Sequence, residues 1–287
     1  MTASDKSTQS LYNQPLRVGP YELPLHRRTL VMGILNVTPD SFSDGGRYNQ
    51  VDRALEHAHR LVKEGADILD VGGESTRPGA TPVSLEEELE RIIPVIEVLA
   101  KEIDVPISVD TYKAEVAKQA LAAGAHLVND IWGLKHDPQM AKVVAQFDVP
   151  VIIMHNRKEA RYDRLIPDMI FDLMESVAIA RRAGIRKEQI ILDPGIGFAK
   201  SYEENLVVMR HLERFVQLGY PVLLGTSRKS MIGHTLGLPA TERIEGTAAT
   251  VALGIAKGCR IVRVHDVREM VRVCRMTDAI LYGPLEQ

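Results

Sequence analysis

The sequence is poor in the features that mark several large classes of protein. It has 2 cysteines in 287 residues, Cys259 and Cys274, too few for a disulfide framework or a cysteine-based zinc site. No apolar run approaches the roughly 18 residues of a membrane helix, and the opening MTASDKSTQSLYNQ is too polar for a secretory signal. The net charge is −3 without a basic stripe, which argues against nucleic acid as a partner. We therefore expect a cytoplasmic protein that binds neither membranes nor nucleic acid.

Several catalytic motifs are missing as well. The chain has no P-loop, no G-x-G-x-x-G after the first expected strand and no H-E-x-x-H metal motif. A G-x-S-x-G nucleophile elbow is also absent, which weighs against covalent acyl chemistry. Any active site is therefore expected to come from residues that the fold brings together.

What the sequence does contain is a regular alternation of strand-like and helix-like segments. Each short apolar, β-branched run is followed by a stretch with helical periodicity. The expected strands are residues 30–35, 68–71, 107–109, 126–128, 151–154, 190–192, 222–224 and 261–264. Eight such units without a break in composition predict an α/β fold, a single-domain (β/α)8 TIM barrel over residues 18–287. Residues 1–17 are expected to form a flexible N-terminal lead-in.

The expected helices carry recognisable ends. Ser84 and Glu87 have the spacing of a capping box, and Pro94 predicts a kink in that helix or a shifted start. Glycines are expected to close five other helices, at positions where a left-handed C-cap favours glycine: Gly65, Gly124, Gly184, Gly219 and Gly258.

A doubly wound open sheet is the alternative architecture, with its ligand at a switch point of the strand order. The polar residues favour the barrel, because almost every expected strand ends in or near one. These residues are Asn36, Asp70, Asp110, Asn129, His155, Asp193, Arg228, Lys229 and His265. In a barrel all the carboxyl ends of the strands converge on one mouth, where such side chains would meet.

Three of these residues, Asp110, Asn129 and Asp193, each end an apolar strand. One such aspartate alone is more often a helix cap than a ligand. Buried carboxylates are costly unless they meet donors. Three polar groups in one mouth would therefore suit a flat heterocycle with amidine-like N–H groups.

Cationic residues gather near the last two expected strands. Arg263 and His265 are two positions apart, so they point to the same face of a strand. Lys229 follows the seventh strand within GTSRKSMIG, at an expected helix start. Arg77 lies in the long polar loop DVGGESTRPGA after the second strand. Together these residues predict the binding of an anion such as phosphate or carboxylate.

These stretches, taken in order, resemble the dihydropteroate synthase family of the folate pathway. The matching segments are MGILNVTPDSFSDGG, DVGGESTRPGA, ISVDT, LVND, MHNR, ILDPGIGFAK, GTSRKSMIG and RVHDV, across about residues 29–270. The resemblance implies a transferase that joins 6-hydroxymethyl-7,8-dihydropterin diphosphate to para-aminobenzoate and releases diphosphate, assisted by Mg²⁺. It also implies a homodimer formed through helices far from the loops of the mouth.

The resemblance assigns roles to individual residues. The implied pterin site consists of Thr76, Asp110, Asn129, Met154, Asp193, Lys229 and Arg263, with Met154 and Arg263 stacked on the two ring faces. Asn36, Arg77, Arg263 and His265 are implied to face the diphosphate, and Asn36 to ligate Mg²⁺. The implied para-aminobenzoate pocket consists of Phe42, Thr76, Pro78, Phe198, Lys229 and Ser230.

By the same resemblance the catalytic residues are Asp110, Lys229, Arg263 and His265. No protein nucleophile is needed, because diphosphate is a good leaving group once its charge is met. We expect a dissociative, SN1-like route in which Asp110 stabilises the pterin cation. The loop after Asn36 is expected to fold over the ligands and to bring Phe42 down as a wall.

Three other functions fit parts of this pattern. A pterin-binding methyltransferase with a corrinoid partner would share the barrel, but it would not need SRKS, RPG and RVHD together. A catalytically silent pterin-binding paralogue would be expected to have lost Phe42, Arg77 or Lys229, which are all present. A Schiff-base aldolase using Lys229 would be revealed by borohydride trapping.

Overall fold

The chain folds into a closed barrel in a computed structural model that describes residues 14–37, 47–74 and 82–283. Its described strands form a sheet of eight parallel strands in the order β8-β7-β6-β5-β4-β3-β10-β9. A parallel bridge between Leu192 and Val222 joins the two edges and closes the sheet. The strands are β3 (Leu30–Asn36), β4 (Ile68–Gly72), β5 (Ile107–Asp110), β6 (Leu127–Asp130), β7 (Val151–Met154), β8 (Ile190–Asp193), β9 (Leu223–Leu224) and β10 (Ile261–Val264). The predicted (β/α)8 barrel is confirmed.

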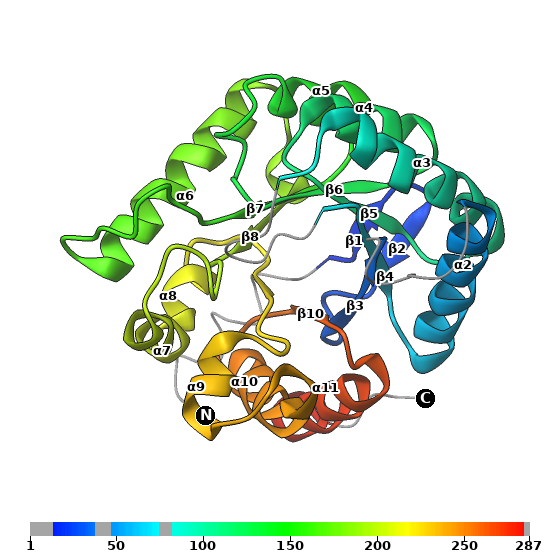
Figure 1. Ribbon diagram of the computed structural model, residues 1–287. Coiled ribbons are helices and arrows are strands. Elements are labelled where there is room, and N and C mark those ends of the chain that lie inside the picture. Colours follow the sequence, from blue (N-terminus) through cyan, green and yellow to red (C-terminus); the bar gives the residue numbers. More distant parts are fainter. Residues whose placement is uncertain (1–13, 38–46, 75–81, 284–287) are drawn as a thin grey trace.

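Helices surround the barrel in chain order (Figure 1). They are α2 (Arg47–Glu64), α3 (Leu85–Glu102), α4 (Ala114–Ala122), α5 (Met140–Phe147), α6 (Leu165–Arg182), α7 (Tyr202–Arg210), α8 (Leu212–Val216), α9 (Ser230–Leu236), α10 (Ile244–Ala256) and α11 (Val267–Tyr282), with short 3-10 turns η2 (Lys187–Gln189) and η3 (Ala240–Glu242). The last helix, α11, contacts α2, so the ring of helices closes together with the sheet. Within the described ranges, no helix has both the length and the apolar character that crossing a membrane requires.

The helix ends follow the local sequence. The Ser84 hydroxyl accepts the backbone N–H of Glu87 at 3.1 Å and caps α3. Pro94 does not shift the start of α3, which begins at Leu85 and runs through the proline. The glycines expected to end helices all adopt a positive φ, as predicted: Gly65, Gly124, Gly184, Gly219 and Gly258.

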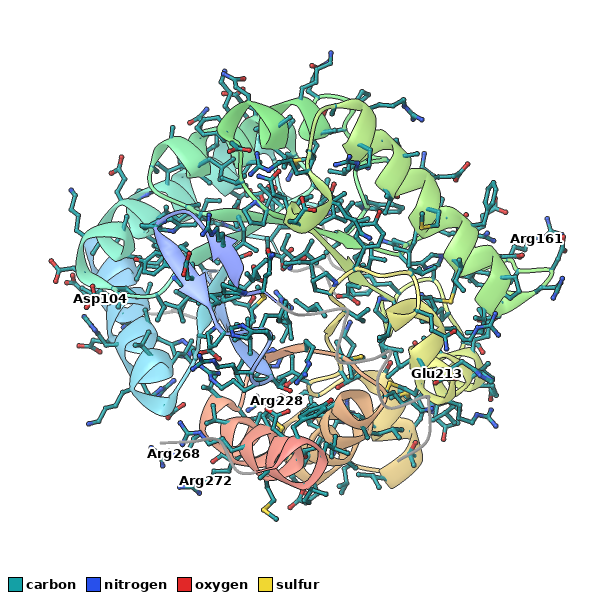
Figure 2. The ribbon with its side chains drawn as sticks, turned by 180° about the vertical axis from the view of Figure 1, so that it is seen from behind. Asp104, Arg161, Glu213, Arg228, Arg268 and Arg272 are labelled. Carbon is teal, nitrogen blue, oxygen red and sulfur yellow. The ribbon has the colours of Figure 1, made fainter. Side chains whose placement is uncertain are left out.

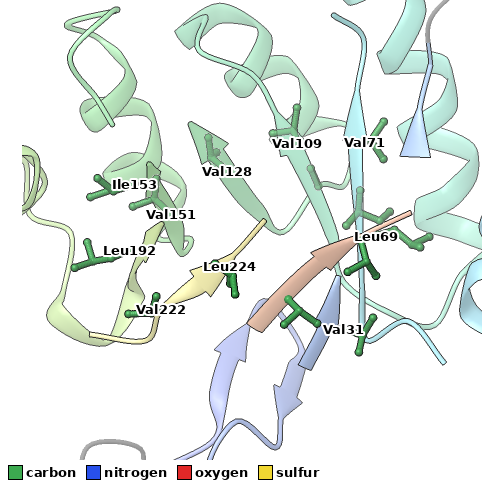
Figure 3. Packing of buried hydrophobic residues seen from close by; sticks show 14 of the residues in the cluster. Val31, Leu69, Val71, Val109, Val128, Val151, Ile153, Leu192, Val222 and Leu224 are labelled. Carbon is green, nitrogen blue, oxygen red and sulfur yellow. The ribbon is translucent and has the colours of Figure 1, made fainter. Parts of the chain in front are cut away.

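Side chains alternate along each strand between the helices and the barrel interior. One set packs outward beneath the helices and forms the larger hydrophobic core (Figure 3). Its members on the strands, or directly before a strand in the case of Val222, include Val31, Leu69, Val71, Val109, Val128, Val151, Ile153, Leu192, Val222 and Leu224. The helices are therefore held to the barrel by a continuous shell of branched aliphatic side chains.

The other set of side chains faces the interior and changes character along the strands. On β4, Ile68 near the amino end is followed two positions later by Asp70. The same step occurs from Leu127 to Asn129 on β6, and the strands β8 and β10 repeat it with Ile191 and Asp193 and with Ile261 and Arg263. The interior is thus apolar at the amino ends of the strands and polar at the mouth.

A hairpin that the sequence did not suggest fills the apolar end of the interior. Strands β1 (Leu16–Val18) and β2 (Tyr21–Leu23) pair antiparallel, and Figure 2 shows them lying across the barrel. Leu16, Val18 and Leu23 join one cluster with the first inward residues of the barrel strands, such as Ile68 and Leu127. We call residues 16–23 the hairpin plug, because it occupies the end of the barrel opposite the mouth.

The plug places the start of the folded chain earlier than expected. Leu16 is only 3% exposed, although it falls within the expected lead-in of residues 1–17. Gly19 makes the turn of the hairpin with φ 57°, and a Cβ atom there would lie 2.7 Å from the ring of His126. The flexible character of residues 1–13 stays a prediction, because they lie outside the described residues.

The plug should contribute measurably to stability. Leu16→Ala removes a buried side chain from the plug, so we expect the free energy of unfolding to fall by about 2–4 kcal/mol. The neighbouring Arg17 is a matched control, because its side chain is 81% exposed. Arg17→Ala should change the free energy of unfolding by less than about 1 kcal/mol. Urea unfolding of both variants decides, and equal losses would contradict the role of the plug.

Candidate active site at the barrel mouth

The three residues predicted to form one polar edge lie at the carboxyl ends of β5, β6 and β8. Asp110 and Asn129 stand directly opposite each other in the pairing of β5 with β6. Asp193 stands opposite Met154 in the pairing of β7 with β8. Asp110, Asn129 and Asp193 are 5%, 4% and 6% exposed, so three polar side chains are buried at the mouth.

Arg263 crosses the interior from β10 and joins two of the carboxylates. Its Nε donates to Asp70 Oδ2 at 2.5 Å, and its Nη2 donates to Asp110 Oδ2 at 2.6 Å. Gly225 lies between Arg263 and Asp193, since a Cβ atom there would be 3.8 Å from Asp193 Oδ2 and 4.0 Å from the Arg263 Cβ. The predicted acidic residues and Arg263 therefore converge on one part of the mouth.

Asp70 is a site residue that the sequence argument missed. It is fully buried, and its Oδ2 also accepts from the Asn129 Nδ2 at 3.1 Å. A carboxylate only accepts hydrogen bonds, so Asp70 fixes which end of the Asn129 amide faces it. The signal available in the sequence was that Asp70, like the chosen residues, is a polar residue close to a strand end.

Two buried carboxylate oxygens point to a ligand with N–H groups. Asp70 Oδ1 and Asp110 Oδ1 are buried without a hydrogen-bond partner among the described residues. A buried acceptor without a donor costs free energy. The mouth is therefore suited to a flat molecule that donates several hydrogen bonds.

Burial controls the acidity of the carboxylates. It raises the pKa of Asp110 to about 7, although the Arg263 guanidinium acts in the opposite direction and Asp70 adds to the rise. Burial also raises the pKa of Asp193, against the stabilising N–H of Gly195, which donates to Asp193 Oδ1 at 2.7 Å. A bound cation or hydrogen-bond donor would favour the ionised forms of both groups.

The cations respond in different ways to the same burial. Burial lowers the pKa of Lys229 to about 8, against the attraction of Asp193. Burial acts in the same direction on Arg263, but Asp70 and Asp110 outweigh it and raise the pKa of Arg263 above its usual value. Arg263 is therefore a permanent cation at the mouth, while Lys229 titrates closer to neutrality.

Lys229 lies at the start of α9 and contacts the loop that follows β8. Its Nζ donates to the carbonyl of Ile196 and lies 4.2 Å from the centre of the Phe198 ring. Ser230, the first residue of α9, is exposed. The structure thus brings together Lys229 and Phe198, two members of the implied para-aminobenzoate pocket.

His265 follows β10 and is held by the loop after β9. Its backbone N–H donates to Ser227 Oγ at 3.1 Å, and the same hydroxyl lies 3.0 Å from His265 Nδ1. Arg228, a strand-end cation in the sequence, instead binds the carboxylate of Asp266, with 2.9 Å from its Nε to Oδ2. The Arg228–Asp266 pair therefore ties the two last loops of the mouth together.

Of the remaining residues in the implied sites, Asn36 lies within the described part of the chain and four others lie outside it. Asn36 ends β3, and a Cβ atom on Gly72 would lie 3.9 Å from its Oδ1 and 3.8 Å from Asp110 Oδ2. The side chains of Asn36 and Asp110 therefore both lie next to Gly72. Four further residues of the implied sites lie outside the described residues: Phe42, Thr76, Arg77 and Pro78.

The family to which this barrel belongs follows from comparison with known proteins. The sequence profile of the family described as pterin binding enzyme matches residues 32–265, and this chain is therefore a member of that family. It is 61% identical to the dihydropteroate synthase of Bacillus subtilis over 93% of this chain and 94% of the relative. It is 56% identical to the enzyme of Clostridium beijerinckii over 93% and 99%. Within the family it belongs with the dihydropteroate synthases, which are transferases.

Solved structures of this group share the fold. The dihydropteroate synthase of Clostridium difficile, determined in the presence of pteroic acid, superimposes with a TM-score of 0.87 at 53% identity. The matched region spans 88% of this chain and 97% of the Clostridium difficile chain. The enzyme of Xanthomonas albilineans, solved with 4-aminobenzoic acid, gives a TM-score of 0.89 at 44% identity over 94% of this chain and all of its own (100%).

The charge coupling between Asp70 and Asp110 can be tested without a ligand. Because the negative charge of Asp70 helps to raise the pKa of Asp110 from its ordinary value to about 7, Asp70→Asn should lower the pKa of Asp110. Carbon-13 NMR of labelled aspartate carboxyls measures this titration. Asp104→Asn, a change at an exposed position, should leave the titration where it is. An Asp110 pKa that stays or rises in Asp70→Asn would contradict the coupling.

Proposed function

We propose that this chain condenses 6-hydroxymethyl-7,8-dihydropterin diphosphate with para-aminobenzoate to give 7,8-dihydropteroate and diphosphate. Its place among the dihydropteroate synthases supports the overall reaction. The observation that carries the assignment of the site is the contact of Arg263 with both Asp70 and Asp110 in the barrel interior. It places a permanent cation next to a buried carboxylate, as a reaction that separates an anion from a cation requires.

The pterin ring is proposed to bind against Asp110, Asn129 and Asp193, with Lys229 reaching its edge. Support comes from the two buried carboxylate oxygens that lack a partner among the described residues, since the pterin edge supplies N–H donors. Met154 and Arg263 are proposed to stack on the two ring faces. A planar guanidinium can stack in this way, whereas a lysine ammonium cannot.

The remaining ligand contacts extend this proposal. The diphosphate is proposed to face Asn36, Arg77, Arg263 and His265. The para-aminobenzoate pocket is proposed to consist of Phe42, Thr76, Pro78, Phe198, Lys229 and Ser230, with Thr76 also touching the pterin. The contact of Lys229 with the Phe198 ring supports the pairing of these two residues in one pocket wall.

The reaction is proposed to be dissociative. The bond between the pterin methylene carbon and the diphosphate oxygen breaks first, and the diphosphate takes the electron pair. The ionised Asp110 then stabilises the cation left on the pterin, and Arg263 and His265 stabilise the departing anion. The neutral amine of para-aminobenzoate attacks the methylene carbon and loses a proton to form dihydropteroate.

Mg²⁺ fits the residues at this mouth as a partner of the diphosphate. In the described ranges no three His, Cys, Asp or Glu side chains gather into a metal site. Mg²⁺ is commonly held by one or two protein oxygens together with phosphate oxygens and water. We propose Asn36 as the protein ligand, since its amide oxygen is a hard donor that lies near Gly72 and Asp110 at the mouth. When bound, the ion would neutralise charge on the leaving diphosphate.

We further propose a cytoplasmic homodimer. Large apolar side chains on α10 and α11 are exposed, among them Leu253 at 41%, Met276 at 62%, Ile280 at 70% and Leu281 at 43%. Three of them lie on the second half of α11, and the carboxyl ends of barrel helices lie away from the mouth. A second copy of the chain on this surface would cover them, as expected for a dimer interface.

The reaction can be tested with the purified protein. Incubation with the pterin diphosphate, para-aminobenzoate and Mg²⁺ should release diphosphate, and chelation of the metal should stop the release. Omission of para-aminobenzoate should also stop it. A catalytically silent paralogue would bind the pterin without release, whereas a methyltransferase would require a methyl donor and a corrinoid partner. Either result would contradict the proposed reaction.

Asp110 and Asp193 should differ in what they contribute. Asp110→Asn removes the charge proposed to stabilise the cation, so we expect turnover to fall about 100-fold to 1,000-fold with little change in pterin affinity. Asp193 is proposed to bind the pterin ring without stabilising the cation. Asp193→Asn should therefore weaken pterin affinity more than turnover. Steady-state kinetics with calorimetric pterin binding separate the two effects. Equal losses of turnover and affinity in Asp110→Asn would argue against cation stabilisation.

The acid limb of the pH profile should belong to Asp110. Because burial raises the pKa of Asp110 in the free enzyme to about 7, the ionised form is lost as the pH falls through that value. The kcat/KM for the pterin substrate should therefore fall below about pH 7, as kcat/KM reports groups of the free enzyme. The diphosphate also titrates in this range, so Asp110→Asn is the comparison. An acid limb unchanged in that variant would assign it to the substrate.

A further inference from the structure

The loop between β8 and α7, residues 194–200, is wound tightly against the end of β7. Gly195 and Gly197 have positive φ of 67° and 83°, and Ala199 adopts 46°, which is unfavourable for a residue with a side chain. A Cβ atom on Gly195 would lie 2.1 Å from the carbonyl oxygen of His155. The backbone conformation of this loop must therefore be held by contacts strong enough to offset its cost.

This loop positions Lys229. The carbonyl of Ile196 accepts from Lys229 Nζ, and the ring of Phe198 lies beneath the same ammonium. A Cβ atom on Gly197 would lie 2.8 Å from the Lys229 Cδ, so the stem of the lysine runs close along the loop backbone. Any movement of the loop would thus shift both Phe198 and the ammonium of Lys229.

A second lysine, Lys200, holds the loop from its other side. Its Nζ donates to the carbonyl of Gly195 at 3.0 Å and to the carbonyl of Phe198 at 2.8 Å. It also lies 3.1 Å from His155 Nδ1. An ammonium has three N–H donors, and here each meets one acceptor. Burial lowers the pKa of Lys200 to about 7, against the attraction of Asp193. The three acceptors around Nζ match the donors of the charged form.

His155 can accept from Lys200 because its other nitrogen is engaged. Its Nε2 lies 3.0 Å from Asp172 Oδ2, which also accepts from the Nε of Arg157 at 2.6 Å. Burial lowers the pKa of His155 to about 4, so the ring is neutral and donates from Nε2 to Asp172. Asp172, on α6, thus orients the imidazole, and the imidazole orients the ammonium of Lys200.

The segment after His155 supports the loop through a further contact. The Tyr162 hydroxyl donates to the carbonyl of Ala199 at 2.8 Å, and the Arg157 guanidinium lies 4.5 Å from the centre of the Tyr162 ring. Arg157 and Tyr162 lie in the segment 157–167, for which the sequence suggests no role. Their contacts place them around the same loop as Lys200.

We propose that Lys200 is a positioning residue for the para-aminobenzoate side of the active site. Its ammonium, held by the His155–Asp172 pair, fixes the 195–198 backbone and so sets the Phe198 ring and Lys229 before the second substrate binds. The proposal rests on the proposed function, which assigns Phe198 and Lys229 to that pocket. Side chains that are already in place before the substrate binds raise the rate of a reaction between two bound molecules.

A purely structural role for Lys200 in starting α7 is the competing explanation. That helix already has a complete cap, because Ser201 Oγ accepts the N–H of Glu204 at 3.1 Å and Glu204 Oε2 accepts the N–H of Ser201 at 2.7 Å. Removing the cap by Ser201→Ala should destabilise α7 without touching the contacts of Lys200 to the loop. Ser201→Ala is therefore the matched control: it weakens the neighbouring helix but leaves the contacts of Lys200 in place.

The decisive variant is Lys200→Met, which keeps an unbranched side chain and removes all three donors. We expect the KM for para-aminobenzoate to rise about tenfold or more, with the KM for the pterin diphosphate changed by less than about threefold, because Asp110 and Asn129 of the pterin edge lie on β5 and β6, away from this loop. Ser201→Ala should lower the urea midpoint and leave the ratio of the two KM values unchanged. The same ratio in Lys200→Met as in Ser201→Ala would overturn the proposal.

A milder variant covers the case in which Lys200→Met does not fold. Tyr162→Phe removes one hydroxyl donor from the same loop, and we expect it to raise the KM for para-aminobenzoate severalfold without changing the urea midpoint appreciably. An unchanged KM in Tyr162→Phe would then overturn the proposal. Failure of the unmodified enzyme to release diphosphate would instead refute the proposed function, so the two failures are distinguishable.

Discussion

Two aspartates buried side by side repel each other, and a single guanidinium makes their burial tolerable. Arg263 donates to Asp70 and to Asp110 at 2.5 and 2.6 Å. Without this cation, two negative charges would be buried side by side at a large desolvation cost. The same contact steadies Asp70, which accepts from Asn129 in turn. The polar half of the barrel interior therefore depends on one side chain of the last strand.

The two-residue period of β-structure places that side chain and its partners on the same inner surface. Ile261 and Arg263 on β10 show the pattern, with an apolar residue at the amino end and a polar one near the mouth. A shift of one residue in the strand pairing would turn Arg263 toward the helices and Val262 toward the ligands. The geometry of the site is thus inseparable from the register of the barrel.

Local patterns in the sequence were enough to predict the eight barrel strands and the glycine helix ends. The hairpin plug escaped because its strands, LRV and YEL, are three residues long and show no extended apolar run. The role of Asp70 escaped for a different reason, since its partner Arg263 lies 193 positions away and meets it only inside the closed barrel. The support of the β8 loop by Lys200 and His155 likewise depends on contacts across 45 positions. Distances of this kind leave no periodic trace in a sequence.

The hairpin plug also closes one end of the barrel interior. Leu16 and Val18 fill the end opposite the mouth. Substrates and products of the proposed reaction would therefore enter and leave through the mouth. In the proposed reaction the pterin would enter through the mouth before para-aminobenzoate, and the joined product would leave through the same opening. A short hairpin of residues 16–23 thereby restricts access to the barrel interior to the opposite end.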